Sequence, residues 1–313
     1  MNIKNITVLG TGTMGHGIAL LSAKAGLNVV MYGRSDESLN RGFNSIKSGL
    51  NLLKEEGKVD EKNCLDILSR IKGVKDLEES VKKADFVIES LAEDLNLKKD
   101  IFSRLDKACG KNVILATNTS GISPSEIGKS TQNPERVVVA HFWNPPQLIP
   151  LVEVVPGEHT SKNVVDITVE WVEYIGKKPV KMEKECLGFI GNRLQLALLR
   201  EALYIVENGW AKPEEVDKAM EYAHGRRLGV TGPICSADLG GLDIFNNIAR
   251  YLFEDLCDYK ETSKLLQNKV DKGQLGSKSG QGFYTWDEKA LKEKQKERTE
   301  VLLSFLDRDN NKK

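Results

Sequence analysis

Four histidines occur in the 313-residue sequence, and His141 is the one whose neighbours suggest proton transfer. Imidazole titrates near neutral pH and can serve as a general base. Glu153 follows twelve residues later, inside the apolar run Leu151–Val155. A carboxylate buried in such a run needs a hydrogen-bonding partner. A hairpin-like return of the chain would bring Glu153 to His141 and orient the imidazole. A structural histidine with a separately solvated glutamate is the other interpretation.

Two further polar side chains are candidates for chemistry. Ser120 follows an apolar run that ends at Ala116, and Asn192 stands near the start of an apolar segment with helical spacing. A helix cap for Ser120 and a domain-interface hydrogen bond for Asn192 are the alternative roles. No Gly-x-Ser-x-Gly sequence surrounds Ser120, which disfavours a serine hydrolase.

The first thirty residues have the pattern of a nucleotide-binding turn. The β-branched run Ile6–Leu9 leads into Gly10-x-Gly12-x-x-Gly15, and Thr13 and Met14 lie inside the turn. In a dinucleotide fold the first glycine makes the turn, the second lets the backbone approach the pyrophosphate, and the third allows close helix–strand packing. The following helix then offers free N–H groups to the phosphates. An ordinary glycine-rich turn is the alternative.

The end of the next apolar strand, Val29–Tyr32, bears on which cofactor is bound. An NAD site usually has an acidic residue there for the ribose 2′-hydroxyl. This sequence has Gly33, Arg34 and Ser35 instead. A guanidinium and a hydroxyl bind a 2′-phosphate, whereas a carboxylate repels it. The sequence therefore favours NADP, and the rival interpretation is that Asp36 takes the acid's role for NAD.

The elements that must position these residues alternate between strand and helix. The segment from residue 36 to 70 reads as a helical hairpin broken at Gly57, and near-continuous apolar strands follow. Such strands, separated by helices, indicate a doubly wound α/β sheet of Rossmann type with its ligands at the C-terminal strand ends. His141 would lie at one of these ends. The strands are predicted at residues 84–89, 113–116, 137–140 and 151–155, the last of which closes the series.

Beyond residue 185 the strand signals vanish, which predicts an all-helical C-terminal domain. Helices are expected at residues 190–206, 214–222, 244–257 and 263–272. We therefore expect a Rossmann domain at residues 1–184, a helical substrate and dimerisation domain at 185–290, and a charged helical tail at 291–313.

Composition excludes several kinds of partner. Lys plus Arg and Asp plus Glu both number 45, so the formal net charge is zero, which argues against a nucleic-acid or membrane-surface partner. We read no signal peptide and no membrane span. The five cysteines are scattered without Cys-x-x-Cys pairs, which fits reduced thiols in a cytoplasmic protein and predicts no metal site.

Six motifs occur in the order of one known family, and together they cover the chain from about residue 6 to residue 284. The sequence resembles the L-3-hydroxyacyl-CoA dehydrogenase family, close to bacterial 3-hydroxybutyryl-CoA dehydrogenases. The motifs are Gly10-x-Gly12-x-Met14-Gly15-x-Gly17, Asn118-Thr119-Ser120, His141-Phe142-Trp143-Asn144-Pro145-Pro146, Leu151-Val152-Glu153-Val154, Gly188-Phe189-Ile190-x-Asn192-Arg193 and Lys278-Ser279-Gly280-x-Gly282-Phe283-Tyr284.

The resemblance implies an NAD(P)-dependent, reversible oxidation of an (S)-3-hydroxyacyl-CoA, of short chain, by a homodimer joined through the C-terminal domain. It makes His141 the general base or acid and Glu153 its orienting partner, and it lets Ser120 and Asn192 hydrogen-bond the substrate oxygen. The positions that it places near the cofactor are Glu93, Lys98, Asn144 and Lys278.

One departure from the family concerns the helical hairpin, which in acyl-CoA enzymes tends to carry a basic cluster that meets the CoA phosphates. Here Lys54 and Lys58 are offset by Glu55 and Glu56. Other segments are similar to gulonate and carnitine dehydrogenases, so a free 3-hydroxy acid, with Arg226 or Arg227 meeting its carboxylate, is the alternative substrate. A non-catalytic nucleotide-binding protein is disfavoured because all four expected catalytic residues are present.

Overall fold

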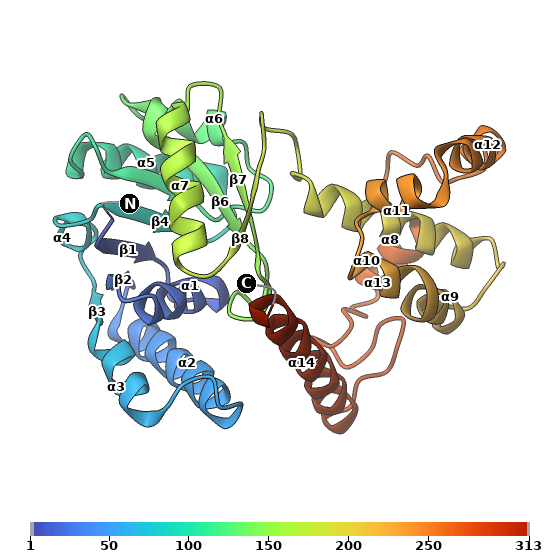
Figure 1. Ribbon diagram of the computed structural model, residues 1–313, viewed down its shortest axis with the longest axis horizontal. Helices are drawn as coiled ribbons and strands as arrows, with labels where there is room; N and C mark the ends of the chain where they lie inside the picture. The colour runs from blue at the N-terminus through green and yellow to red at the C-terminus, as the bar shows by residue number, and fades with distance from the viewer. Residues whose placement is uncertain (1–2, 312–313) are drawn as a thin grey trace. The chain divides into compact units, whose positions relative to one another are not determined.

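The computed structural model describes residues 3–311, which form two compact units (Figure 1). Unit 1 contains the chain up to Ile190 together with the stretch from Thr299 onward, and unit 2 is Gly191–Arg298. The domain limits expected from the sequence stay predictions. Within residues 3–311, no helix is both long and apolar enough to cross a membrane.

Unit 1 is built on one eight-stranded sheet with the order β3-β2-β1-β4-β5-β6-β7-β8. All neighbouring strands are parallel except β6 and β7, which are antiparallel. This confirms the predicted Rossmann-type sheet. The strands are β1 (Asn5–Leu9), β2 (Asn28–Tyr32), β3 (Ile71–Val74), β4 (Phe86–Glu89), β5 (Ile114–Thr117), β6 (Val137–Phe142), β7 (Leu151–Pro156) and β8 (Lys178–Lys181).

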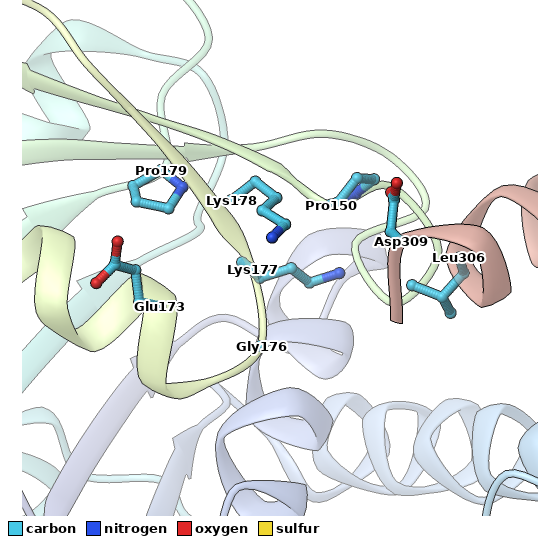
Figure 2. A pocket seen from close by; sticks show the side chains of 8 residues that line it. All are labelled: Pro150, Glu173, Gly176, Lys177, Lys178, Pro179, Leu306 and Asp309. Carbon is cyan, nitrogen blue, oxygen red and sulfur yellow. The ribbon is translucent and has the colours of Figure 1, made fainter. Parts of the chain in front are cut away.

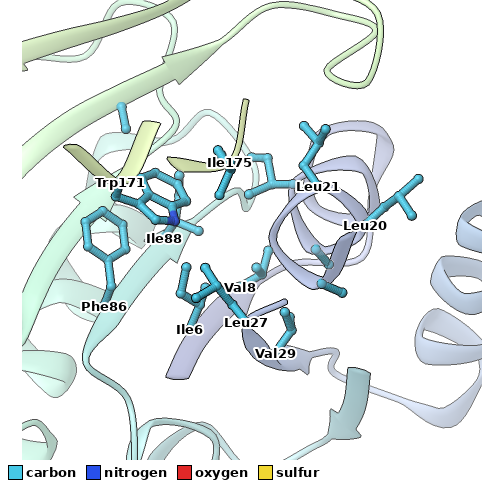
Figure 3. Packing of buried hydrophobic residues seen from close by; sticks show 14 of the residues in the cluster. Ile6, Val8, Leu20, Leu21, Leu27, Val29, Phe86, Ile88, Trp171 and Ile175 are labelled. Atoms are coloured by element: carbon cyan, nitrogen blue, oxygen red, sulfur yellow. The ribbon is translucent and has the colours of Figure 1, made fainter. Parts of the chain in front are cut away.

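Helices cover both faces of the sheet, because successive strand residues point to opposite sides. Phe86 and Ile88 belong to a core with helices α1, α2, α3 and α7, where Trp171 stacks on Phe86 with ring centroids 4.4 Å apart (Figure 3). Val87 belongs to the opposite core with α4, α5 and α6. The helices are α1 (Thr13–Lys24), α2 (Asp36–Glu55), α3 (Glu61–Ser69), α4 (Leu77–Val81), α5 (Leu95–Ala108), α6 (Pro124–Gly128) and α7 (Lys162–Tyr174).

The predicted helical hairpin is confirmed as α2 and α3, which are separated at Gly57, a residue with a φ of +65°. Two strands, β3 and β8, were not expected. The expectation that residues 151–155 close the strand series was wrong, because β8 pairs with β7 in parallel. Both strands are four residues long, and β8 carries a lysine at each end and a proline, so neither forms a long apolar run.

Unit 2 is all-helical, as predicted, and is organised around α8. Glu201 of α8 accepts a hydrogen bond from the Cys257 amide at 2.8 Å, and Glu207 accepts one from the Ser263 hydroxyl at 2.6 Å. Tyr204 packs edge-on against Tyr259. The helices are α8 (Gly191–Glu207), α9 (Pro213–Ala219), α10 (Gly225–Leu228), α11 (Pro233–Gly240), α12 (Leu242–Leu252) and α13 (Lys264–Asp271), and a π-helix spans Met220–His224.

The last helix, α14 (Glu288–Asn311), belongs to both units. Its first turns are counted with unit 2, and from Thr299 onward it belongs to unit 1. There Leu303 is buried, and Asp307 forms an ion pair with Lys58 of the hairpin. The predicted helical tail therefore begins a few residues earlier than expected, and its residues 312 and 313 lie outside the described residues.

Candidate active site

His141 and Glu153 face each other across the β6–β7 pair. The antiparallel register puts the two residues directly opposite, and the imidazole Nδ1 lies 2.8 Å from Glu153 Oε2. Both side chains are buried. The predicted hairpin-like return of the chain is confirmed. Because a carboxylate only accepts hydrogen bonds, Nδ1–H is the donor, and Nε2 of the neutral imidazole is left with the lone pair.

The Glu153 carboxylate is fixed by further donors. Trp143 Nε1–H donates to the same Oε2 at 3.2 Å, and the backbone N–H of Ile190 donates to Oε1 at 2.9 Å. The rings of Trp143 and Phe189 have their centroids 5.5 and 5.7 Å from that of the imidazole. Sequence reasoning missed the parts played by Trp143 and Ile190, although both lie in motifs that it quoted.

The glycine turn has the shape that the sequence predicts. Gly10 adopts a φ of +113°, and a Cβ on Gly15 would lie 2.1 Å from the Gly10 carbonyl oxygen. A Cβ on Gly12 would meet nothing within 4 Å. Gly12 is also the N-cap of α1 and supplies no side chain, so nothing from this residue covers the first N–H groups of the helix, which carries Thr13 and Met14. The turn therefore fits a dinucleotide phosphate.

The glycine turn and the His141 segment are packed together. A Cβ on Gly17 would lie 2.3 Å from Cγ of Pro146, so α1 runs against the residues that follow His141, among them the exposed Asn144. The Phe142 amide donates to Asn118 Oδ1 at 2.7 Å. This bond joins the end of β6 to the segment that carries Ser120.

Ser120 is linked through the exposed Glu93 to the buried ion pair of Lys98 and Glu89. Its amide donates to Glu93 Oε1 at 3.0 Å, and its hydroxyl lies 3.3 Å from the same oxygen. Lys98, which is 1% exposed, pairs with Glu89 at 2.8 Å and with Glu93 at 3.4 Å. Burial opposes ionisation of Glu93, but hydrogen bonds from Thr119 and Ser120 and the Lys98 charge outweigh it and hold the pKa of Glu93 below its ordinary value.

Glu89 is a second residue that sequence reasoning missed. It is fully buried at the end of β4, where its carboxylate accepts hydrogen bonds from Lys98, from the Thr117 hydroxyl at 2.7 Å and from the Leu91 amide at 2.6 Å. The sequence marks Glu89 in the same way as Glu153, because each is a carboxylate within an apolar strand.

Asn192 and Lys278 belong to unit 2, and their predicted roles toward substrate and cofactor stay predictions. Asn192 is the second residue of α8, and Lys278 is exposed. Arg226 lies over the ring of Tyr222, with its guanidinium carbon 4.8 Å from the ring centroid.

At the end of β2, a side chain at position 33 would crowd the side chains of Ser38 and Leu39. A Cβ on Gly33 would lie 2.7 Å from the Ser38 hydroxyl oxygen. Ser35 is the N-cap of α2 and accepts a hydrogen bond from the Ser38 amide, and its hydroxyl helps to lower the pKa of Glu37. Arg34 is exposed, and within residues 3–311 its guanidinium forms no ion pair.

Both lysines of the hairpin tip are engaged in ion pairs. Lys54 contacts Glu61 at 2.8 Å, and Lys58 contacts Asp307 of α14. The tip therefore does not present these two ammonium groups as a free basic cluster.

A pocket of about 230 Å³ lies in unit 1 beside β8 and the end of α14 (Figure 2). None of the predicted site residues lines it. The buried Lys177 is one of the residues that line the pocket, and its side-chain nitrogen donates a hydrogen bond to the Ile149 carbonyl at 3.0 Å. Burial, together with the nearby charge of Lys24, lowers the pKa of Lys177 to about 7.

Comparison with known proteins follows the two halves of the chain. Residues 5–186 match the 3-hydroxyacyl-CoA dehydrogenase NAD binding domain, and residues 188–286 match the 3-hydroxyacyl-CoA dehydrogenase C-terminal domain. A probable 3-hydroxybutyryl-CoA dehydrogenase of Bacillus subtilis is 39% identical, over 92% of this chain and 99% of that protein.

Two similar proteins carry names without CoA. The 5-formyl-3-hydroxy-2-methylpyridine 4-carboxylate 5-dehydrogenase of Mesorhizobium japonicum is 32% identical over 96% of this chain and 97% of its own length. The L-carnitine dehydrogenase of Oceanobacillus iheyensis is 33% identical over 97% of this chain and 98% of its own.

Among solved structures, a crystal structure of a 5-formyl-3-hydroxy-2-methylpyridine 4-carboxylic acid 5-dehydrogenase, described as an NAD⁺-dependent dismutase, is similar with a TM-score of 0.89 and 31% identity. It covers 96% of this chain and 97% of that one. The paired domain matches and the full-length relatives agree with the buried histidine–glutamate pair and the glycine turn. The chain therefore belongs to the 3-hydroxyacyl-CoA dehydrogenase family and is an NAD(P)-dependent oxidoreductase.

Proposed function

We propose that the protein catalyses reversible oxidation of a 3-hydroxyacyl substrate at C3, with His141 as the general base. The observation that supports this most is the buried His141–Glu153 pair, which lies at the C-terminal ends of the parallel strands, as the glycine turn does. When bound, the nicotinamide accepts the hydride. His141 Nε2 takes the hydroxyl proton, while Glu153 holds Nδ1–H and stabilises the imidazolium that forms.

The remaining predicted residues orient the reactants. Ser120 and Asn192 donate hydrogen bonds to the substrate oxygen and stabilise the charge that develops on it during reduction of the ketone. The turn Gly10–Gly15 binds the pyrophosphate. The other positions assigned to the cofactor are Glu93, Lys98, Asn144 and Lys278.

Replacement of His141 tests the proposal. His141→Gln should lower kcat by about 10²–10⁴ in both directions, because general-base assistance is lost. Binding of the nicotinamide cofactor, followed by protein fluorescence, should be retained. His159→Ala removes an exposed histidine of unit 1 and is the matched control. Full activity of His141→Gln would refute the assignment.

A short-chain (S)-3-hydroxyacyl-CoA, such as 3-hydroxybutyryl-CoA, is the first candidate substrate. Support comes from the two family domains and from the 39% identical relative, which is named a probable 3-hydroxybutyryl-CoA dehydrogenase.

A free 3-hydroxy acid is the second candidate, and two observations favour it. Lys54 and Lys58 are already paired with carboxylates. Two relatives that align over 96–97% of this chain, at 32% and 33% identity, carry names without CoA. Arg226 or Arg227 would then meet the substrate carboxylate.

Initial rates of NADH and NADPH consumption with acetoacetyl-CoA and with free 3-keto acids distinguish the two candidates. A kcat/KM at least tenfold higher for acetoacetyl-CoA supports the thioester, and the reverse ratio supports the free acid. Absence of turnover on every 3-keto compound, with thermal stabilisation by cofactor, would support a non-catalytic protein instead.

We also propose that Arg34 gives a preference for NADP(H). The preference is supported by the absence of a carboxylate at position 33 and by the exposed guanidinium of Arg34 beside it, which forms no ion pair within residues 3–311. Ser35 contributes less, because its hydroxyl already serves as the α2 N-cap. NAD(H) is the alternative, favoured by Asp36 and Glu37 in the first turn of α2. Arg34→Ala should raise the KM for NADPH at least tenfold and leave the KM for NADH unchanged; equal effects would contradict the preference.

A further inference from the structure

The indole of Trp143 has no part in the function proposed above, yet it contacts both members of the catalytic pair. Its Nε1–H donates to Glu153 Oε2 at 3.2 Å, and the same oxygen accepts Nδ1–H of His141 at 2.8 Å. The indole and imidazole rings are tilted by 53°, with centroids 5.5 Å apart. One carboxylate oxygen therefore serves two donors from one short segment of β6 and its loop.

We infer that Trp143 is a positioning residue that sets the basicity of His141 by sharing the carboxylate oxygen on which the imidazole depends. The inference rests on the proposed role of His141 as the general base, and it adds a residue to which that proposal gives no role.

The direction of the effect follows from charge. An N–H donor stabilises a carboxylate most when the carboxylate has no cation beside it. The Trp143 hydrogen bond is therefore stronger while His141 is neutral than while it is an imidazolium. The bond thus favours the neutral imidazole, which is the form that accepts a proton from a hydroxyl group.

We expect the Glu153 carboxylate to stay in position when the indole donor is removed, because two other features hold it. Glu153 Oε1 still accepts the Ile190 amide at 2.9 Å, and the cross-strand register of β6 and β7 fixes its distance from His141. Loss of the indole N–H therefore leaves more negative charge on the Glu153 carboxylate and changes its distance from the imidazole little.

Other ionisable groups lie on the elements around the imidazole. Strand β7 carries Glu153, the segment after β5 leads to Glu93, and the segment before α8 contributes the Phe189 ring, with Cys186 three residues earlier. Of these groups, Glu153 is the one hydrogen-bonded to the imidazole. The change in basicity is therefore attributed to the shared oxygen.

Trp143→Phe is the matched test, because it keeps an aromatic ring and removes the donor. We expect the NMR titration midpoint of His141, measured in the cofactor-free protein, to rise by about 0.5 pH unit, since a weakened hydrogen bond to a charged group has that order of effect. The acidic limb of kcat/KM for alcohol oxidation should move to higher pH by a similar amount, with kcat within tenfold of the parent.

Controls separate the possible failures. His141→Gln assigns the signal among the four imidazoles, and Trp210→Phe removes an exposed indole of unit 2 and should leave the midpoint unchanged. A midpoint that stays or falls in Trp143→Phe overturns the inference. Activity of His141→Gln would refute the proposed function instead, and the titration would still measure the Trp143 effect. If Trp143→Phe does not fold, benzothienylalanine at position 143 keeps the bicyclic ring without the N–H.

Discussion

At the scale of single residues, the Glu89–Lys98 pair should contribute strongly to stability. Both side chains are almost fully buried, and removing one partner of such a pair leaves an uncompensated charge. Lys98→Met should therefore lower the free energy of unfolding by about 3–5 kcal/mol, measured by urea denaturation. The ion pair Lys99–Glu126 is partly exposed, so Lys99→Met is a control expected to cost less than about 1 kcal/mol.

The double variant Glu89→Gln/Lys98→Met tests the physical reason for this loss. Since no unpaired charge remains on Glu89, the double variant should be more stable than Lys98→Met alone. Additive losses from the two single changes would show that charge pairing is not the source of the effect.

The residue-scale prediction from sequence succeeded where a buried charge had to find a partner. Glu153 interrupts an apolar run, so the partner could be sought on a neighbouring strand, and His141 was the available group. The same reasoning holds for Glu89, which ends the apolar strand β4 and pairs with Lys98. The Ile190 amide could not be predicted, because every residue has such a donor and the sequence does not mark which one is aimed at a carboxylate.

At the scale of elements, two substitutions in the glycine turn should have different effects, one on cofactor binding and the other on stability. Gly12→Ala places its methyl group in open space, so the free energy of unfolding should change by less than about 1 kcal/mol, while cofactor affinity should fall at least tenfold. Gly15→Ala meets the Gly10 carbonyl oxygen at 2.1 Å and should destabilise the fold by about 1–3 kcal/mol. Titration with cofactor and denaturation curves measure both. Equal cofactor affinity in Gly12→Ala and the parent would contradict the role of the turn.

The buried Lys177 next to β8 gives stability a dependence on pH. Its pKa of about 7 lies below the ordinary lysine value, so the unfolded chain binds a proton that the folded chain does not bind. The free energy of unfolding should therefore rise as pH rises from about 7 toward 10. Lys177→Met should lose this rise, as shown by denaturation at pH 7, 8 and 9. An unchanged slope would mean that the amine is protonated when folded.

Element prediction worked for segments with long apolar runs and failed for short edge strands. Strands β4, β5, β6 and β7 lie inside the sheet and are almost entirely apolar, which marks them in the sequence. Strands β3 and β8 form the two edges, where one side meets no further strand and charged residues are accepted. Their pairing depends on neighbours that are distant in sequence.

At the scale of the whole molecule, we propose that unit 2 forms a dimer interface with a second copy of the chain. Within the described part of unit 2, Leu203 and Cys257 are the only hydrophobic residues that are buried. Large apolar side chains are exposed along α11 and α12: Ile234, Leu239, Leu242, Ile244, Phe245 and Ile248. An exposed apolar area of this extent is typical of a subunit interface.

A charge placed on α12 tests the interface. Phe245→Glu should shift sedimentation velocity from dimer to monomer and lower the melting temperature, because a carboxylate would have to be desolvated between subunits. Lys111→Glu, an exposed change on unit 1, should have no effect on either measurement. A monomeric parent protein would contradict the dimer.

The membership of α14 in both units means that the polypeptide crosses between them twice, at residues 190–191 and 298–299. After a cut at the first crossing, the end of α14 still packs noncovalently within unit 1, through the buried Leu303 and the ion pair of Asp307 with Lys58. A protease nick near residue 188 should yield two fragments in denaturing gels that still migrate together in a native gel. The C-terminal helix would therefore keep the two fragments associated after the covalent link between them has been cut.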